Sequence, residues 1–353
     1  MQQITTNTIA VGVDVHKYTH TAVALDCFGK ELSSLEFSNL KLDEYVSWLN
    51  NLGEKENLLI GLEDTSANGL HISKTLDKEK FSYRHVPPVL TERERQKSVK
   101  RDKSDRVDAK RVGKVILNKY EETLPATNIV TKKVKDTRAI DLLIQERDSL
   151  VRDQTELKNQ MHSLLHQHYG DEYKKGFYDI FCMKALMMYE DELTKEKGYI
   201  TKCILRKIQK LRLIAEQIKE INKEIVKISK TLKEVKILES IQGCGNLTAC
   251  RIIVEIKDIT RFPSSDHLAS YAGIAPIDRS SGRSKRVITN SGGNRKLNRA
   301  IYIIALTQIG NRGYTPGREY YQKKKQEGKT SLWALRCLKR QVIKRIYNQL
   351  IEV

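Results

Sequence analysis

The sequence lacks several features that would assign it to common protein classes. No stretch approaches the roughly 18 consecutive apolar residues of a membrane span, and the N-terminus lacks the basic start and apolar run of a signal peptide. The six cysteines include no Cys-x-x-Cys pair, which argues against a disulfide framework or a zinc ribbon. Gly328-Lys-Thr330 lacks the upstream glycine of a Walker A motif. We therefore expect a cytoplasmic protein with reduced thiols, no membrane partner and no need for ATP.

Acidic residues are scarce relative to basic ones. The 353 residues include 63 Lys and Arg against 44 Asp and Glu, a formal net charge of +19. Residues 277–353 hold 18 basic and only four acidic residues, with five tyrosines among them. Such a field attracts a polyanion, and the tyrosine rings can stack on bases. This composition favours nucleic acid as the partner, with a solvated lysine-rich surface as the plainer alternative.

The order of apolar runs predicts a mixed α/β domain over residues 1–125. Residues 8–37 contain three closely spaced strand patterns, typical of an antiparallel meander. Further strands are expected at 57–62 and 82–86, with helices at 42–52 and 67–76. Three hairpin-ordered strands followed by alternating helix and strand is the pattern of a ribonuclease-H-like, or RuvC-like, domain. The segment 121–136, which holds Pro125, is expected to be a linker at the end of this domain.

Residues 126–235 are expected to form a helical coiled-coil region for linkage or oligomerisation. Apolar residues recur at coiled-coil spacing along two seams, namely Leu143, Leu150, Leu157 and Leu164, and then Ile214, Ile218, Ile221, Ile225, Ile228 and Leu232. Two arms of this kind pair either with each other in an antiparallel hairpin or across subunits, and the pattern does not decide between these arrangements.

Residues 236–353 are expected to form a basic, mainly helical C-terminal domain. Its start, around Gly243-Cys-Gly245, resembles a helix-hairpin-helix turn, in which glycine lets backbone N–H groups approach a phosphate. A plain helix connection is an equally good interpretation. Further on, Asn290-Ser-Gly-Gly-Asn294 precedes a helical run whose first turns present three cations to an anion, namely Arg295, Lys296 and Arg299.

Four acidic residues form the main candidate site. Asp14 ends the first apolar strand and Glu63 directly follows the strand at 58–62, while Asp105 and Asp108 share one face of an expected helix. Converging carboxylates repel each other unless a cation neutralises them, and such hard oxygen ligands suit Mg²⁺ or Mn²⁺. Two such ions can activate a nucleophile and stabilise the leaving oxygen of a phosphodiester. The four acids therefore predict a two-ion phosphoryl-transfer site, although each alone would be read as a surface charge.

The order of these acids resembles the DEDD-type, RuvC-like domain of a family of bacterial insertion-sequence transposases. This family includes the pilin-gene invertase, and some of its members are guided by a bridge RNA. The C-terminal part is also similar to the family, at Leu268-Ala-Ser-Tyr-Ala-Gly-Ile-Ala-Pro276, Ser280-Ser281-Gly282 and Leu297-Asn-Arg-Ala300. Asp64 follows Glu63 where relatives often carry a small residue, so Asp64 competes for the acidic role.

The resemblance implies a serine nucleophile in the C-terminal domain, and Ser281 occupies the corresponding place, or Ser280 if the alignment is off by one. Four cations surround it and are placed to offset charge developing on phosphorus, namely Arg279, Arg283, Lys285 and Arg286. The implied activity is strand exchange between donor and target DNA through a phosphoserine link, by a dimer or tetramer at the bacterial nucleoid, with a bridge RNA as guide.

Two other functions compete with this interpretation. A RuvC-like endonuclease would hydrolyse DNA with water and would not need Ser281. A non-catalytic coiled-coil protein would bind nucleic acid and carry the acids as relics. The four-acid pattern argues against the second, and without the resemblance the serines would be read as part of a phosphate-binding basic loop.

Overall fold

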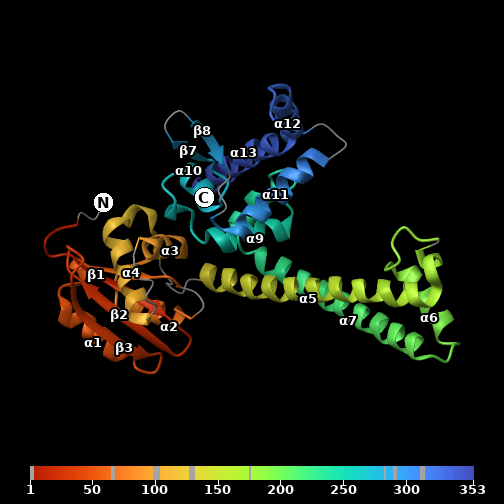
Figure 1. The fold of residues 1–353 in the computed structure, drawn as a ribbon, viewed down its shortest axis with the longest axis horizontal. Helices are drawn as coiled ribbons and strands as arrows, with labels where there is room; N and C mark the ends of the chain where they lie inside the picture. The colour runs from red at the N-terminus through yellow and green to blue at the C-terminus, as the bar shows by residue number, and fades with distance from the viewer. Residues whose placement is uncertain are drawn as a thin grey trace. The chain divides into compact units, whose positions relative to one another are not determined.

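A computed structural model describes residues 4–64, 68–97, 104–126, 132–174, 176–281, 284–288, 292–310 and 315–353. Its contacts divide the chain into two compact units, each built from two separate segments of sequence (Figure 1). The first unit comprises Met1–Val134 and Asp258–Arg295, and the second comprises Lys135–Lys257 and Lys296–Val353. The predicted division into three domains is a different partition and stays a prediction.

The first unit contains a six-stranded mixed sheet in the order β3-β2-β1-β4-β5-β6. The first three strands form the expected antiparallel meander, β4 and β5 continue parallel to β1, and β6 returns antiparallel at the edge. The strands span Ile9–Val15 (β1), Thr19–Leu25 (β2), Glu31–Ser38 (β3), Leu58–Leu62 (β4), Tyr83–His85 (β5) and Leu124–Ala126 (β6). The predicted mixed α/β sheet is thus present.

Helices cover both faces of this sheet because its central strands are apolar on both sides. One core joins alternate strand residues such as Val11, Val13 and Ile60 to α1 (Leu42–Leu52) and α2 (Leu70–Lys78). The other core joins the intervening residues, including Ala10, Val23 and Leu59, to α3 (Pro88–Gln96) and α4 (Asp105–Asn118). Successive side chains of a strand point to opposite faces, so each strand contributes to both cores.

Two local expectations differ from the structure. The predicted linker at 121–136 contains β6, whose residues Leu124–Ala126 pair with β5. A three-residue edge strand holding Pro125 carries no periodic signal, and an edge position tolerates proline. The helix expected from residue 67 begins at Leu70, and residues 65–67 lie outside the described part of the chain.

The remainder of the first unit carries the segment that holds the predicted serine. Helix α10 (Ser265–Tyr271) begins at a Ser264 cap whose hydroxyl accepts bonds from the amides of Asp266 and His267. It is followed by an antiparallel hairpin of β7 (Ile277–Ser281) and β8 (Ser284–Ile288). Short 3-10 turns occur in the two units at Lys55–Asn57, Tyr120–Glu122, Gly170–Lys174 and Ile259–Arg261.

The second unit is built on two long antiparallel helices, α5 (Lys132–Tyr169) and α7 (Tyr199–Ser229), connected through α6 (Met183–Leu193). Three side-chain hydrogen bonds between the two arms show that the helices run in opposite directions. As the residue number rises along α5, the number of the bonded residue in or just after α7 falls. The pairs are Asp136–Thr231, Arg147–Asn222 and Gln160–Lys207. The two predicted seams therefore pair within one chain as an antiparallel hairpin, and pairing across subunits stays a prediction.

The C-terminal helices complete the second unit. They are α8 (Lys233–Glu239), α9 (Asn246–Ile256), α11 (Arg295–Gly310), α12 (Pro316–Gln326) and α13 (Ser331–Ile351). Helices α8 and α9 are joined by the glycine turn that resembles a helix-hairpin-helix. Gly243 in this turn has φ 87°, and a Cβ there would come within 3.1 Å of the Ile304 carbonyl oxygen of α11. One side of the turn thus packs against protein, and phosphate binding by the turn stays a prediction.

Helix α4 lies unusually close to β1 because both elements have glycine at the crossing. A Cβ added to Gly12 would overlap the carbonyl oxygen of Ala109 and the backbone nitrogen of Gly113. A Cβ on Gly113 would in turn come within 2.9 Å of the Leu25 side chain. Backbone rather than side-chain atoms fill this crossing, so a side chain at Gly12 has no rotamer that avoids the contact.

We predict that Gly12→Ala destabilises the first unit by about 3 kcal/mol, because a methyl group there must push α4 away from the sheet. Urea unfolding followed by far-UV circular dichroism measures this change. The matched control is Gly310→Ala, where an added Cβ meets no atom within 4 Å and the helix gains up to about 1 kcal/mol. Equal stability of the Gly12 variant and the natural protein would contradict the close approach.

Candidate metal centre of the mixed sheet

Two of the predicted acids lie side by side because their strands are parallel neighbours. β1 pairs with β4 in a register that sets Val13 opposite Leu62. Asp14 and Glu63 are the next residues of the two chains, so both come to the carboxyl edge of the sheet. The Asp14 side chain is 15% exposed. The apolar strand residues before each acid therefore fix where the two carboxylates stand.

The other two acids occupy the first turn of α4. The helix starts at Asp105. Ser104 is its N-cap, and the Ser104 hydroxyl accepts a hydrogen bond from the Val107 amide. Carboxylates in a first helical turn are stabilised by the unpaired N–H groups and the positive end of the helix dipole. Because α4 crosses β1 at the glycine contact, its N-terminal turn presents Asp105 and Asp108 to the edge that carries Asp14.

A histidine that sequence reasoning did not select completes this cluster. The His16 Nε2 atom lies 3.2 Å from Asp14 Oδ2 and 3.3 Å from Asp105 Oδ1. Ligand atoms of these three residues all lie within 4.8 Å of one another, close enough to share one metal ion. The available signal was that His16 stands two residues after Asp14, which places both on one side of an extended chain.

The electrostatics of the cluster show uncompensated negative charge. Burial raises the pKa of Asp14 to about 6; His16 opposes this rise, while Asp108, Asp105 and Glu63 add to it. Burial also raises the pKa of Glu63, and the charge of Asp108 raises it further. The His16 imidazole lies between the Asp14 and Asp105 carboxylates, within reach of both.

The carboxylates of Glu63 and Asp64 interact with different groups. Glu63 is coupled to Asp14 and Asp108 and forms a hydrogen bond with Thr91 of α3. The Asp64 carboxylate instead accepts a hydrogen bond of 2.7 Å from the Asn68 amide. This geometry favours Glu63 over Asp64 as the fourth acid of the cluster.

Asp108 forms an ion pair with a buried arginine of the same helix. The Arg111 guanidinium, only 8% exposed, forms an ion pair with Asp108 one turn along α4. Asp105 is 62% exposed and is contacted by His16 instead. Asp108 is therefore the less exposed of the two acids and is paired with a buried cation.

The donor set fits a hard divalent cation. Ligand atoms of Asp14, His16 and Asp105 lie close enough to share one ion, and the charges of Asp108 and Glu63 act on Asp14 from nearby. Mg²⁺ binds few carboxylates and keeps water ligands, while Mn²⁺ also accepts imidazole. Asp14, Glu63, Asp105 and Asp108 would hold the ion or ions, and His16 is a further ligand available to Mn²⁺.

Of the predicted serine segment, the structure describes the backbone. Ser281 is the last residue of β7 and pairs with Ser284 of β8, while Ser280 pairs with Lys285. Arg279 pairs with Arg286 in the same backbone ladder. Gly282 and Arg283 lie outside the described residues. The nucleophile and the cations around it stay predictions.

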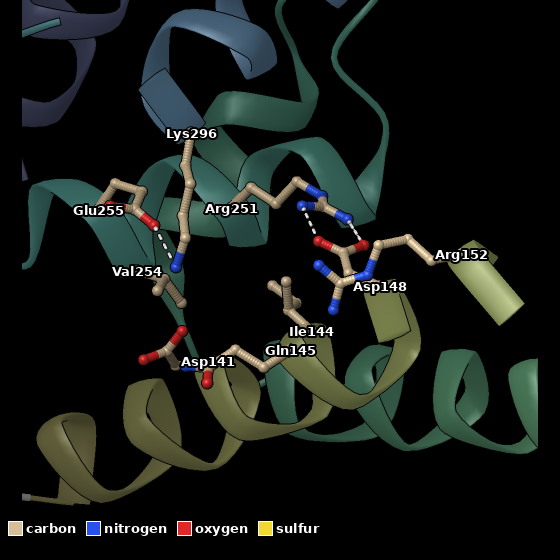
Figure 2. Close-up of a pocket in the computed structure, with 9 residues that line it drawn as sticks. All are labelled: Asp141, Ile144, Gln145, Asp148, Arg152, Arg251, Val254, Glu255 and Lys296. Atoms are coloured by element: carbon tan, nitrogen blue, oxygen red, sulfur yellow. Dashed lines mark hydrogen bonds and ion pairs between the residues drawn. The ribbon is translucent and has the colours of Figure 1, made fainter. Parts of the chain in front are cut away.

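The other predicted cations lie at the start of α11, and two of them, Lys296 and Arg299, lie near acids of the second unit. Lys296 Nζ lies 3.7 Å from Glu255 Oε1 of α9 (Figure 2). The charge of Arg299 helps to keep the pKa of Asp148 low. The Asn294 amide donates to the Tyr271 carbonyl at 2.7 Å, so one N–H before this helix is already engaged. Phosphate binding by Arg295, Lys296 and Arg299 stays a prediction.

Comparison with known protein families gives matches at both ends of the chain. A family described as transposase, of the IS110 DEDD type, matches residues 11–170. A second, described as the transposase IS116/IS110/IS902 family, matches residues 235–322. The first match includes all four acids of the sheet edge, and the second includes the β7–β8 hairpin. These matches define the chain as a transposase, a class whose members move or rearrange DNA.

Individual relatives agree with this class. The chain is 24% identical to the transposase for insertion sequence element IS1328 of Yersinia enterocolitica, over 88% of this chain and 87% of that protein. It is 39% identical to an uncharacterized 43.6 kDa protein of insertion element IS110 from Streptomyces coelicolor, over 32% of this chain and 28% of that protein. The pilin gene-inverting protein of Moraxella bovis is 32% identical over 33% of this chain and 34% of its own length. The chain belongs to the IS116/IS110/IS902 family of transposases.

Within the described part of the chain, none of the helices combines the length and the apolar character that crossing a membrane requires. The long helices α5 and α7 bury their apolar residues against each other and against α6 instead.

We predict that Asp14 makes the metal-free protein less stable as pH rises. The carboxyl titrates near 3.8 when unfolded and at about 6 when folded, so the folded state binds more protons between these values and loses stability as pH rises through them. Relative to Asp14→Asn, the natural protein should lose about 2 kcal/mol between roughly pH 4 and pH 7. Urea unfolding in EDTA measures both stability curves, and parallel curves would contradict the raised pKa.

Proposed function

We propose that this protein cuts and rejoins the DNA of an insertion sequence through a metal-assisted phosphoserine intermediate. The observation that carries the proposal is the convergence of four acids on one sheet edge, in a segment that matches the DEDD-type transposase family. The strand order of the sheet and the helices on both faces support a ribonuclease-H-like, RuvC-like fold for this segment.

The acids hold the divalent ions that the reaction needs. Bound Mg²⁺ or Mn²⁺, as a pair, supplies Lewis-acid stabilisation of charge on the scissile phosphate. Asp14 and Glu63 provide the rigid, partly buried side of the site, and Asp108 is oriented by Arg111. Asp105 and His16 form the exposed side, where an ion or a DNA phosphate can enter.

Ser281 supplies the nucleophile in this proposal. Its Oγ attacks the scissile phosphorus, the bond from phosphorus to the 3′ oxygen breaks, and that oxygen leaves as a free 3′-hydroxyl after taking a proton. The hydroxyl of another strand then attacks the phosphoserine and releases the serine. Each step exchanges one phosphodiester for another, so bond energy is conserved without ATP. The basic residues Arg279, Arg283, Lys285 and Arg286 are the groups proposed to offset charge on the phosphate.

The partners follow from the reaction. Joining strands from donor and target DNA requires two duplexes, so a dimer or tetramer is proposed as the working form. A bridge RNA is proposed as the guide, since pairing of RNA with DNA would supply sequence recognition while the basic C-terminal segment contacts backbone phosphates. The net charge of +19 supports binding of both nucleic acids.

Hydrolysis by a RuvC-like endonuclease is the second candidate function. The observation that favours it is that every acid of the cluster lies within residues 14–108, so the ion site needs nothing from the C-terminal segment. In that reaction water replaces Ser281 and the DNA ends carry no protein.

We predict that Ser281→Ala abolishes covalent protein–DNA adducts while leaving DNA affinity within about twofold, because only the nucleophilic oxygen is removed. Adducts on labelled DNA with Mg²⁺ are resolved by denaturing gel electrophoresis, with the bridge RNA of the same element added. Ser280→Ala is the matched control and should retain adducts. Adducts that persist without Ser281 would refute its role, and cleavage without adducts in the natural protein would establish the hydrolytic alternative.

We predict that Asp14→Asn weakens Mn²⁺ binding by about tenfold or more, because it removes a largely buried carboxylate that faces the ion. Electron paramagnetic resonance of free Mn²⁺ during a titration measures the affinity without any activity assay. Asp43→Asn on α1, an exposed acid away from the site, should leave the affinity unchanged. Equal binding by all three proteins would remove the metal centre from the proposal.

A further inference from the structure

The second unit contains a pocket that the proposed chemistry does not use. It has a volume of about 320 Å³ and lies between α5, α9 and α11 (Figure 2). Its chemistry is set by Asp141, Ile144 and Arg152 of α5, Arg251 and Val254 of α9, and Lys296 of α11. All three helices belong to one compact unit over these residues, so the pocket is a feature of that unit alone.

One end of the pocket carries more positive charge than its carboxylate neutralises. Arg251 forms a two-pronged ion pair with Asp148, and Arg147 Nη1 lies 3.8 Å from the same carboxylate. Burial would raise the pKa of Asp148, yet the bonds and charges of Arg251, with the charges of Arg147 and Arg299, hold it below its usual value. Arg152, one turn further along α5, is exposed and has no ion pair among the described residues. A second anion therefore fits at this arginine end.

The opposite end pairs an acceptor with a donor. Lys296 contacts Glu255 and its ammonium group points into the pocket near Asp141 (Figure 2). Asp141 has no ion pair with any residue that the structure describes. A carboxylate that only accepts hydrogen bonds and an ammonium that only donates them thus line the same pocket. The pairing edge of guanine presents the opposite order, one acceptor oxygen beside two N–H donors.

Apolar side chains separate the two polar ends. Ile144 of α5 is 6% exposed and Val254 of α9 is 8% exposed, and both line the pocket. Proteins that hold a nucleobase outside a helical stack commonly place aromatic or aliphatic side chains against its faces. An arginine end, an apolar middle and an acid–lysine end match the phosphate, the ring faces and the pairing edge of one nucleotide.

We propose that this pocket binds one unpaired guanine nucleotide of a nucleic acid strand. Arg152 and Arg251 contact its phosphate, Ile144 and Val254 contact the base, Asp141 accepts from the guanine N1 and N2 hydrogens, and Lys296 donates to O6. This inference rests on the proposed function insofar as the protein handles nucleic acid, and it adds a base-specific contact away from the metal centre.

The alternative is that these charged residues only hold the three helices together. Such a structural role would explain the ion pairs of Arg251 with Asp148 and of Lys296 with Glu255. It does not explain why Asp141 and Arg152 line the same pocket without ion pairs among the described residues. These two side chains are therefore the ones to change, because their loss breaks no described pair and leaves the packing of the unit in place.

Fluorescence anisotropy on the full-length protein tests the proposal. The probes are labelled oligouridine strands about nine nucleotides long, with one central uridine, guanosine or inosine. We expect guanosine to bind about tenfold tighter than uridine, as a good bidentate base contact gives, with inosine between them because it lacks the N2 amino group. All strands are compared at one salt concentration, so the contribution of the phosphate backbone to the affinity is the same for each and cancels.

Three variants separate the contacts. Asp141→Ala should bind the guanosine and uridine strands equally, and Arg152→Ala should weaken both strands by the same factor. Asp153→Ala, an exposed acid outside the pocket, should behave like the natural protein. Equal binding of guanosine and uridine by the natural protein, or a preference kept by Asp141→Ala with an unchanged melting temperature, would overturn the proposal.

A parallel series of deoxyribonucleotide strands identifies the source of the ligand. A guanine preference confined to RNA assigns the pocket to a guide strand, and one that also appears with DNA assigns it to a substrate strand. Mn²⁺ binding and adduct formation are scored separately from these affinities. Failure of the guanine preference with intact adducts therefore rejects only this site, and the reverse result rejects only the proposed chemistry.

Discussion

The backbone contact between β1 and α4 is the constraint on which the candidate centre depends. Gly12 and Gly113 allow helix and sheet to approach without an intervening side chain. As a result, the first turn of α4 reaches the edge where β1 ends at its acid. A wider helix–sheet spacing, set by ordinary side chains, would separate the helical acids from the strand acids. Gly12 and Gly113 are therefore needed to bring the acids together, although neither contacts the candidate ion.

The acids in turn impose an electrostatic cost on the fold. Asp14 is desolvated, and its neighbours add like charge, which raises its pKa to about 6. The protein offsets part of this cost with Arg111 behind Asp108, with the helix dipole at α4 and with the imidazole of His16. The remaining negative charge is what the proposed cation site would use, since arginines that neutralised it fully would occupy the positions of the ion.

Much of this arrangement could be predicted from sequence because it is carried by strong patterns. Apolar runs that end in an acid predicted the strands and the positions of Asp14 and Glu63, and the i, i+3 spacing predicted the helical pair. The direction of the long helices could not be predicted, because heptads specify a face and not a partner. The strand at 124–126 and the role of His16 were missed because a three-residue strand and a single histidine carry no periodic signal. The pocket of the second unit was missed as well, since its three helices are distant in sequence.

The antiparallel pairing of α5 with α7 also bears on how the chain folds. Its hydrogen bonds join residues 47 to 95 apart in sequence, compared with 103 for the Arg251–Asp148 pair between α9 and α5, so closing this hairpin first loses less chain entropy. It can form once α7 has left the ribosome, while residues 296–353 are still being synthesised. The late helices then add to a preformed scaffold, and the basic tail emerges only after a folded surface exists to receive it.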